Sequence, residues 1–146
     1  MDNVVAIAND HAGVALKAAL APVVAACGFT LLNLGTDNTD SVDYPDYGRR
    51  AADSVAQGKA RFAIIICGSG IGISIAANKV KGIRCALCND VYSAKKAREH
   101  NNANVLCLAG RSTPAALGKK IAETFLNARF EGGRHERRVR KIEHAV

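Results

Sequence analysis

Apolar and polar positions alternate along the chain in blocks that predict strands and helices in turn. Short runs rich in Val, Ile and Leu are typical of buried strands, and longer stretches with apolar residues three and four apart are typical of helices. The predicted strands are 3–8, 29–35, 61–67, 83–88 and 103–110. The predicted helices are 12–27, 46–57, 70–80, 91–100, 113–130 and 134–145.

Five strands separated by helices predict an α/β fold with one parallel sheet and helices on both of its faces. We expect a three-layer α/β/α sandwich around a five-stranded, Rossmann-like sheet. The whole chain, 1–146, is expected to form a single domain, with the basic C-terminal helix 134–146 as an arm. Thr113 is expected to cap the helix 113–130 with Pro114 at its first position, and Pro22 to kink or interrupt the first helix.

Composition agrees with a folded domain and narrows its surroundings. The chain is 49% hydrophobic and 23% charged, so it can fill a core, and it has no Trp. The N-terminus has no basic segment, and the long apolar runs are broken by Lys17 and Pro22, so neither a signal peptide nor a membrane span is expected. Five cysteines in mostly apolar runs indicate reduced thiols and a cytoplasmic protein.

One cysteine pair has the spacing of a metal motif. It is "CALC" at 85–88, inside a strand-like run. Because side chains alternate along a strand, Cys85 and Cys88 should point to opposite faces, which predicts core packing rather than zinc binding.

The formal net charge of +7 leaves several kinds of partner open. A cluster of basic residues lies near the C-terminus, at Arg134, Arg137, Arg138, Arg140 and Lys141. Such a cluster can bind nucleic acid, bind an anionic small molecule, or form a solvated helix face. Arg134 and Arg138 are four apart, so they share one helical face, and two guanidinium groups there would suit a phosphate.

The stretch "CGSGIG" at 67–72 joins a buried strand to a helix. Ligands of parallel sheets bind beyond the carboxyl ends of the strands, and a helix start favours both an anion and a thiolate. Cys67 is therefore a candidate reactive thiol. Gly68 and Gly70 fit part of a dinucleotide-binding motif, but Ile73 replaces its last glycine, so that interpretation is weak.

Other strand exits and helix ends carry polar groups. Asp10 and His11 follow the first strand, Arg111 follows the fifth, and His100 and Asn101 close a helix. Neither His11 nor His100 has metal-ligand spacing, so no metal is expected.

Long motifs carry a resemblance to a known family. "NDHAG", "VDYPDYG", "CGSGIGISIAANKVKGIRCAL", "REHNNANVLCLAGR" and "FEGGRHERRVRKI" resemble type B ribose-5-phosphate isomerase, whose family includes the galactose-6-phosphate isomerase subunits. The resemblance runs from Val4 to Ile142. It implies an aldose–ketose isomerase of the non-oxidative pentose phosphate pathway that interconverts ribose 5-phosphate and ribulose 5-phosphate without metal or organic cofactor.

The resemblance also implies the roles of individual residues. The proton-transferring base falls on Cys67, the ring-opening group on His100, and Ser69 joins them as the third catalytic residue. The implied substrate contacts are Asp10, His11, Gly68, Ser69, Gly70, Ile71, Gly72, Asn101, Arg111, Arg134 and Arg138. Ser69 stands where Thr is commoner in the family, and both carry a hydroxyl.

Alternatives remain open at this stage. The substrate could be a six-carbon sugar phosphate such as allose 6-phosphate or galactose 6-phosphate, or the protein could bind a phosphosugar without turnover. A nucleic-acid binder is a third, disfavoured class, and no membrane partner is expected. The resemblance and the Gly132–Gly133 break predict a homodimer or tetramer with shared sites, in which His100, Asn101 and Arg111 serve Cys67 of another chain.

Overall fold

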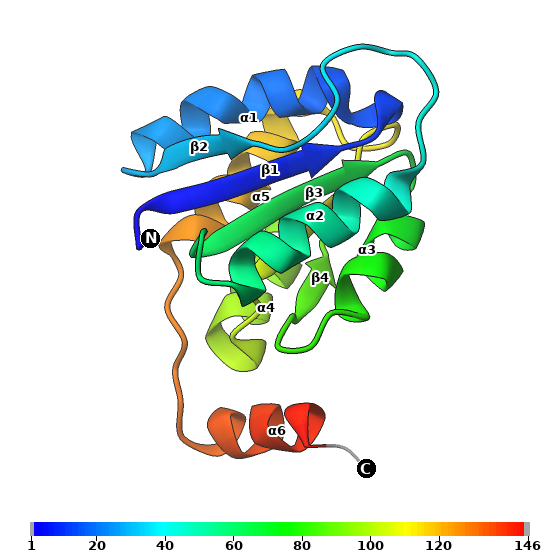
Figure 1. Ribbon diagram of the computed structural model, residues 1–146. Coiled ribbons are helices and arrows are strands. Elements are labelled where there is room, and N and C mark those ends of the chain that lie inside the picture. The colour runs from blue at the N-terminus through cyan, green and yellow to red at the C-terminus, as the bar shows by residue number, and fades with distance from the viewer. Residues whose placement is uncertain (1, 145–146) are drawn as a thin grey trace.

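The computed structural model describes residues 2–144, which form one parallel sheet with helices around it (Figure 1). The strands lie in the order β2-β1-β3-β5-β4, and each pair of neighbours is parallel. The strands are β1 (Val4–Asn9), β2 (Thr30–Asn33), β3 (Phe62–Cys67), β4 (Cys85–Leu87) and β5 (Val105–Ala109). The helices are η1 (His11–Gly13), α1 (Val14–Ala26), α2 (Tyr44–Ala56), α3 (Ile71–Asn78), α4 (Val91–Asn101), α5 (Ala115–Asn127) and α6 (Arg134–Glu143).

Helices cover both faces of the sheet, which confirms the three-layer sandwich. One core cluster joins the sheet to α1, α4 and α5, and the other joins it to α2 and α3. Strand β3 lies at the centre and is buried at every position. Its side chains alternate between the clusters, with Ile64 and Ile66 facing α1 and Ile65 and Cys67 facing α3.

The same alternation separates the two cysteines of "CALC". Cys88 belongs to the cluster under α1, α4 and α5, and Cys85 packs against the cluster on the opposite face. Both thiols are free. The prediction of opposite faces is confirmed.

The neighbouring strands β1 and β3 form the topological switch point of the sheet. The chain leaves β1 into α1 on one face, and it leaves β3 into α3 on the other. Two connections that diverge in this way open a crevice beyond the carboxyl ends of the strands, where α/β proteins bind their ligands. The loops that begin at Asp10 and at Gly68 border that crevice.

Local bonds shift several element boundaries away from the expected ones. The first helix begins with a 3-10 turn, because the Asp10 carboxylate accepts the Ala12 N–H at 2.9 Å. Helix α5 is capped by Pro114 rather than Thr113, because Pro114 is extended (φ −56°, ψ 144°) and Ala115 is the first helical residue. Helix α1 continues through Pro22 instead of ending there.

The short edge strand β4 and the end of α5 also differ from expectation. The Arg84 N–H donates to the Asn104 side chain at 2.8 Å, so the ladder begins only at Cys85. Helix α5 ends at Asn127, because Ala128 is extended with ψ 149°. The extended segment that follows carries the chain away from the sandwich to α6, which packs below α4 (Figure 1). The expected helix 134–145 ends at Glu143, and positions 145 and 146 lie outside the described residues.

Among residues 2–144, no helix combines the length and the apolar character that crossing a membrane would require.

Candidate active site

A cleft of about 320 Å³ opens at the carboxyl ends of β1 and β3, at the switch point of the sheet. Its walls bring together most of the strand-exit residues that the sequence singled out. The lining residues are Asp10, His11, Tyr44, Cys67, Gly68, Ser69, Gly72 and Arg111.

The turn after β1 holds Asp10 and His11 in fixed orientations. Asp10 is buried and uses one carboxylate oxygen to cap the 3-10 turn at Ala12. His11 accepts the Val42 N–H on its Nδ1 at 3.2 Å. That bond assigns the imidazole proton of neutral His11 to Nε2, so the ring offers a donor to a ligand.

The glycine loop after β3 is pressed against β4 and β5. Gly70 has φ 74°, and a side chain there would place its Cβ 2.5 Å from Leu87 Cδ1 and 3.1 Å from the Leu108 carbonyl oxygen. The Cys107 thiol lies 3.0 Å from the Gly70 carbonyl oxygen and donates to it. A residue with a Cβ therefore fits neither the backbone angle nor the space.

The start of α3 supplies an anion cradle. The first N–H groups of a helix have no partner inside the helix and point away from its N-terminus. One of them, on Ile71, donates to Ser69 Oγ at 3.2 Å, which leaves the Ser69 hydroxyl proton free to turn toward a ligand. Those of Gly72 and Ile73 follow it in the first turn.

Cys67 is the one cysteine that lines this cleft, and its side chain is otherwise buried. Burial raises the pKa of Cys88 to about 12 and holds the pKa of Cys107 well above its usual range. Burial, followed by the charge of Glu123, also raises the pKa of Cys27. These three thiols are thus poor nucleophiles, as expected for core cysteines.

Arg111 belongs to the same cleft as Cys67 of its own chain. The Gly110 N–H donates to the Cys67 carbonyl at 2.8 Å, and the Arg111 N–H donates to the Gly68 carbonyl at 3.1 Å. The Arg111 guanidinium covers Gly68, where a Cβ would lie 3.0 Å from Nη1. The prediction that Arg111 serves Cys67 of another chain is therefore wrong.

The remaining predicted site residues lie at the opposite edge of the sheet. Helix α4 starts near the carboxyl ends of the strands and returns to their amino ends, a path of about 16 Å for its eleven residues. His100 and Asn101 are its last two residues. Arg134 and Arg138 are exposed on α6, beyond the same edge.

His100 stands in a cluster with Glu131 and His135. The two imidazole rings stack at 4.0 Å with 9° between their planes. The Glu131 carboxylate lies 3.9 Å from His100 Nε2 and 3.7 Å from His135 Nε2. Burial, then the charges of His100 and Arg134, lowers the pKa of His135.

The donor atoms of this cluster lie within 4.8 Å of one another, close enough to be tested as a metal site. Sequence spacing missed it because Glu131 reaches in from the segment before α6. The nitrogen lone pairs of an imidazole lie in the plane of the ring, so two parallel stacked rings direct them side by side rather than toward one ion. The geometry fits two stacked histidines beside a carboxylate better than a coordinated metal.

Tyr44 is a cleft residue that the sequence prediction did not single out. It opens α2 after the polar segment 36–43, and its ring lies against Gly72, where a Cβ would collide with it. The available signal was the motif "VDYPDYG", which places an aromatic ring at a helix start beside a polar loop.

Comparison with known proteins shows the family of this chain. The sequence model of the family described as Ribose/Galactose Isomerase matches residues 5–142. The chain belongs to this family. It is similar to ribose-5-phosphate isomerase B of Escherichia coli, with 41% identity over 138 residues that cover 94% of this chain and 93% of that protein.

Solved structures of the family share the fold. Type B ribose 5-phosphate isomerase of Trypanosoma brucei is 45% identical, with a TM-score of 0.96 and 100% of both chains covered. Ribose-5-phosphate isomerase B of Mycoplasma genitalium, solved with bound ribulose-5-phosphate, is 42% identical, with a TM-score of 0.93 and coverage of 97% of this chain and 95% of that one.

Proposed function

We propose that this protein interconverts ribose 5-phosphate and ribulose 5-phosphate by proton transfer through an enediolate, without metal or organic cofactor. The observation that carries the proposal is the position of Cys67, the cysteine whose thiol lines the switch-point cleft beside a helix N-terminus and Arg111. The related Mycoplasma genitalium structure with bound ribulose-5-phosphate supports the choice of substrate.

The residues of the cleft suit each step of this reaction. The Cys67 thiolate takes the proton from C2 of the open aldose, the C–H electron pair forms the C1–C2 double bond, and the carbonyl electrons move to O1. A proton then passes from O2 to O1, the O2 electrons form the C2 carbonyl, and the C1–C2 electron pair takes the proton back from the Cys67 thiol at C1, which gives the ketose. A positioned general base contributes about 10²–10⁴-fold to the rate. The N–H groups of the loop and of α3 would hold the charged oxygen, where one donor contributes about 10²–10³-fold.

Two parts of the predicted machinery are absent from the cleft of a single chain: the ring-opening His100 and the phosphate-binding pair Arg134 and Arg138. We propose that a second copy of the chain supplies them. Exposed apolar side chains beside the cleft support such a contact, because Ile71 and Ile75 are four residues apart on α3 and are 57% and 55% exposed. The five free thiols are consistent with a reducing, cytoplasmic setting.

A steady-state assay tests the reaction itself. The protein is mixed with ribose 5-phosphate in EDTA and ketose formation is followed, with allose 6-phosphate, galactose 6-phosphate and free ribose in parallel. We expect turnover of ribose 5-phosphate to exceed that of the others. Faster turnover of a six-carbon substrate would reassign the specificity, and binding without turnover would indicate a phosphosugar-binding protein.

Subunit complementation tests the shared site. Cys67→Ala chains mixed with His100→Ala chains should regain activity after subunit exchange, because one site of each mixed dimer would carry both defects and the other neither. Arg111→Ala is the matched control: it shares a cleft with Cys67, so Cys67→Ala mixed with Arg111→Ala should stay inactive. If mixed dimers of the first pair form and remain inactive, the shared-site proposal fails.

A further inference from the structure

Helix α6 is fastened to the rest of the molecule at both of its ends. Near its start, the Glu131 N–H donates to the Glu99 carbonyl at 3.0 Å and His135 stacks on His100. In the middle, Val139 is buried. At its last residue, Glu143 pairs with Arg84, which precedes β4.

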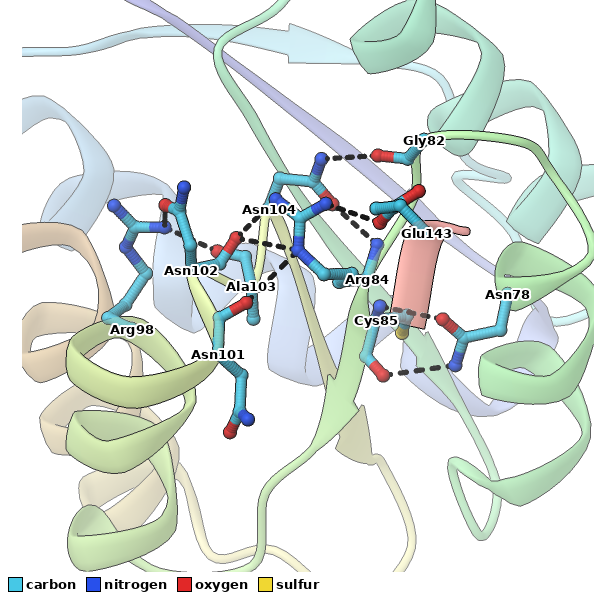
Figure 2. Close-up of polar contacts among 10 residues, drawn as sticks. All are labelled: Asn78, Gly82, Arg84, Cys85, Arg98, Asn101, Asn102, Ala103, Asn104 and Glu143. Carbon is cyan, nitrogen blue, oxygen red and sulfur yellow. Dashed lines mark hydrogen bonds and ion pairs between the residues drawn. The ribbon is translucent and has the colours of Figure 1, made fainter. Parts of the chain in front are cut away.

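Figure 2 shows that the bonds holding the end of α6 converge on Arg84. Its guanidinium Nη1 donates to Glu143 Oε1 at 2.5 Å. Nε donates to the Asn101 carbonyl at 3.0 Å, and Nη2 donates to the Asn102 carbonyl at 2.9 Å. One planar group therefore holds the end of α4 and the end of α6 together.

Arg84 is held by further bonds, and its pair with Glu143 is partly covered. The Arg84 N–H donates to Asn104 Oδ1 at 2.8 Å, and Asn104 Nδ2 donates to the Gly82 carbonyl at 2.9 Å. The side chains of Arg84 and Glu143 are only 18% and 28% exposed. By contrast, the ion pair of Glu136 with Arg140 within α6 joins side chains that are 53% and 72% exposed.

We propose that Arg84 and Glu143 are positioning residues that fix Arg134 and Arg138 at a set distance from His100. The inference rests on the proposed function, in which His100 opens the sugar ring and the two arginines bind the phosphate. The Arg84–Glu143 pair, here called the latch, joins α4 and α6, the two helices that carry these groups. It therefore sets the span between the phosphate and the ring oxygen of a bound sugar, and a substrate one carbon longer would be held out of register.

The test compares Glu143→Ala with Glu136→Ala, two changes on the same helix that remove a partly covered and a more exposed ion pair. For Glu143→Ala, kcat/KM for ribose 5-phosphate should fall roughly tenfold, mainly through KM. Free ribose has no phosphate to place, so its kcat/KM should not change, and discrimination against allose 6-phosphate should narrow. Glu136→Ala should leave all three substrates unaffected.

Different outcomes would refute the positioning role of the latch and the phosphate-binding role of Arg134. An equal fall for ribose and ribose 5-phosphate in Glu143→Ala would show a general structural defect, and no fall for either would show that the pair does not position α6. Arg134→Ala is measured alongside. If it lowers the preference for the phosphorylated sugar and Glu143→Ala does not, the latch fails and the function stands. If Arg134→Ala leaves that preference unchanged, the phosphate role itself is wrong and the inference falls with it.

A measurement without substrate completes the test. Amide hydrogen exchange in α6 should speed up in Glu143→Ala and not in Glu136→Ala, because Glu143 ties the helix to Arg84 whereas Glu136 pairs within the helix. Unchanged protection of α6 would overturn the proposed attachment.

Discussion

Replacing Gly70 by Ala isolates the physical reason for the glycine loop. The residue has φ 74°, a region that costs an L-residue about 1–2 kcal/mol. The new Cβ would also lie 2.5 Å from Leu87 Cδ1 and 3.1 Å from the backbone of Leu108. Overpacking of this kind costs about 1–3 kcal/mol. The reduced entropy of the unfolded chain returns about 0.4–1 kcal/mol.

Gly82→Ala is the matched control. Its φ is 83°, and a Cβ there would have no atom within 4 Å. Gly82→Ala carries the backbone strain without the overpacking, and Gly70→Ala carries both. We therefore expect the free energy of unfolding to fall by about 1 kcal/mol for Gly82→Ala and by about 2–4 kcal/mol for Gly70→Ala.

Urea denaturation followed by circular dichroism, at one protein concentration for all variants, measures both losses. Gly70→Ala should also lower kcat, because the loop must move away from β4 and β5 to admit the methyl group. If the two variants lose the same free energy of unfolding, contact with β4 and β5 does not hold the loop, and the packing explanation for Gly70 is refuted.

Three further predictions concern Cys67, Pro22 and Asp37. Iodoacetamide at pH 8 should modify Cys67 before Cys88 and Cys107, whose pKa values burial raises, and a phosphosugar should protect Cys67; mass spectrometry of the labelled peptides decides. Pro22→Ala should raise the free energy of unfolding by about 1–3 kcal/mol, because α1 runs through Pro22 and regains an N–H donor, and a lower midpoint in urea would contradict this. Hydrogen bonds from Lys17 and Asn33 lower the pKa of Asp37. The stabilisation from the charged carboxylate is therefore complete above about pH 4, and it is lost as the pH falls through the pKa of Asp37 in the folded state. Asp37→Asn should reduce the fall in the free energy of unfolding that acid causes over this range.

Periodicity predicted the sheet, its parallel character and the two covered faces, because burial on both sides of β3 leaves a continuous apolar run that is easy to read. Boundaries were less predictable where a side chain competes with the backbone ladder. Asp10 turns the start of the first helix into a 3-10 turn, and Asn104 takes the N–H of Arg84 and shortens β4 to three residues. Such bonds join positions up to twenty residues apart, and no local pattern contains them.

Some residues of the candidate site could be grouped from the sequence and others could not. Residues that leave a parallel strand must meet at one edge, so Asp10, Cys67 and Arg111 could be grouped from their positions in sequence, and the cleft contains all three. That argument should also have kept Arg111 with its own Cys67, since both follow neighbouring strands of one sheet. Residues that leave a crossover helix must lie at the other edge. His100 closes α4, so its distance from Cys67 follows from topology alone. If Cys67 and His100 act on one sugar, the His100 must come from a second copy of the chain. This need for a second copy follows from the topology of the parallel sheet, which places the two residues at opposite ends of its strands.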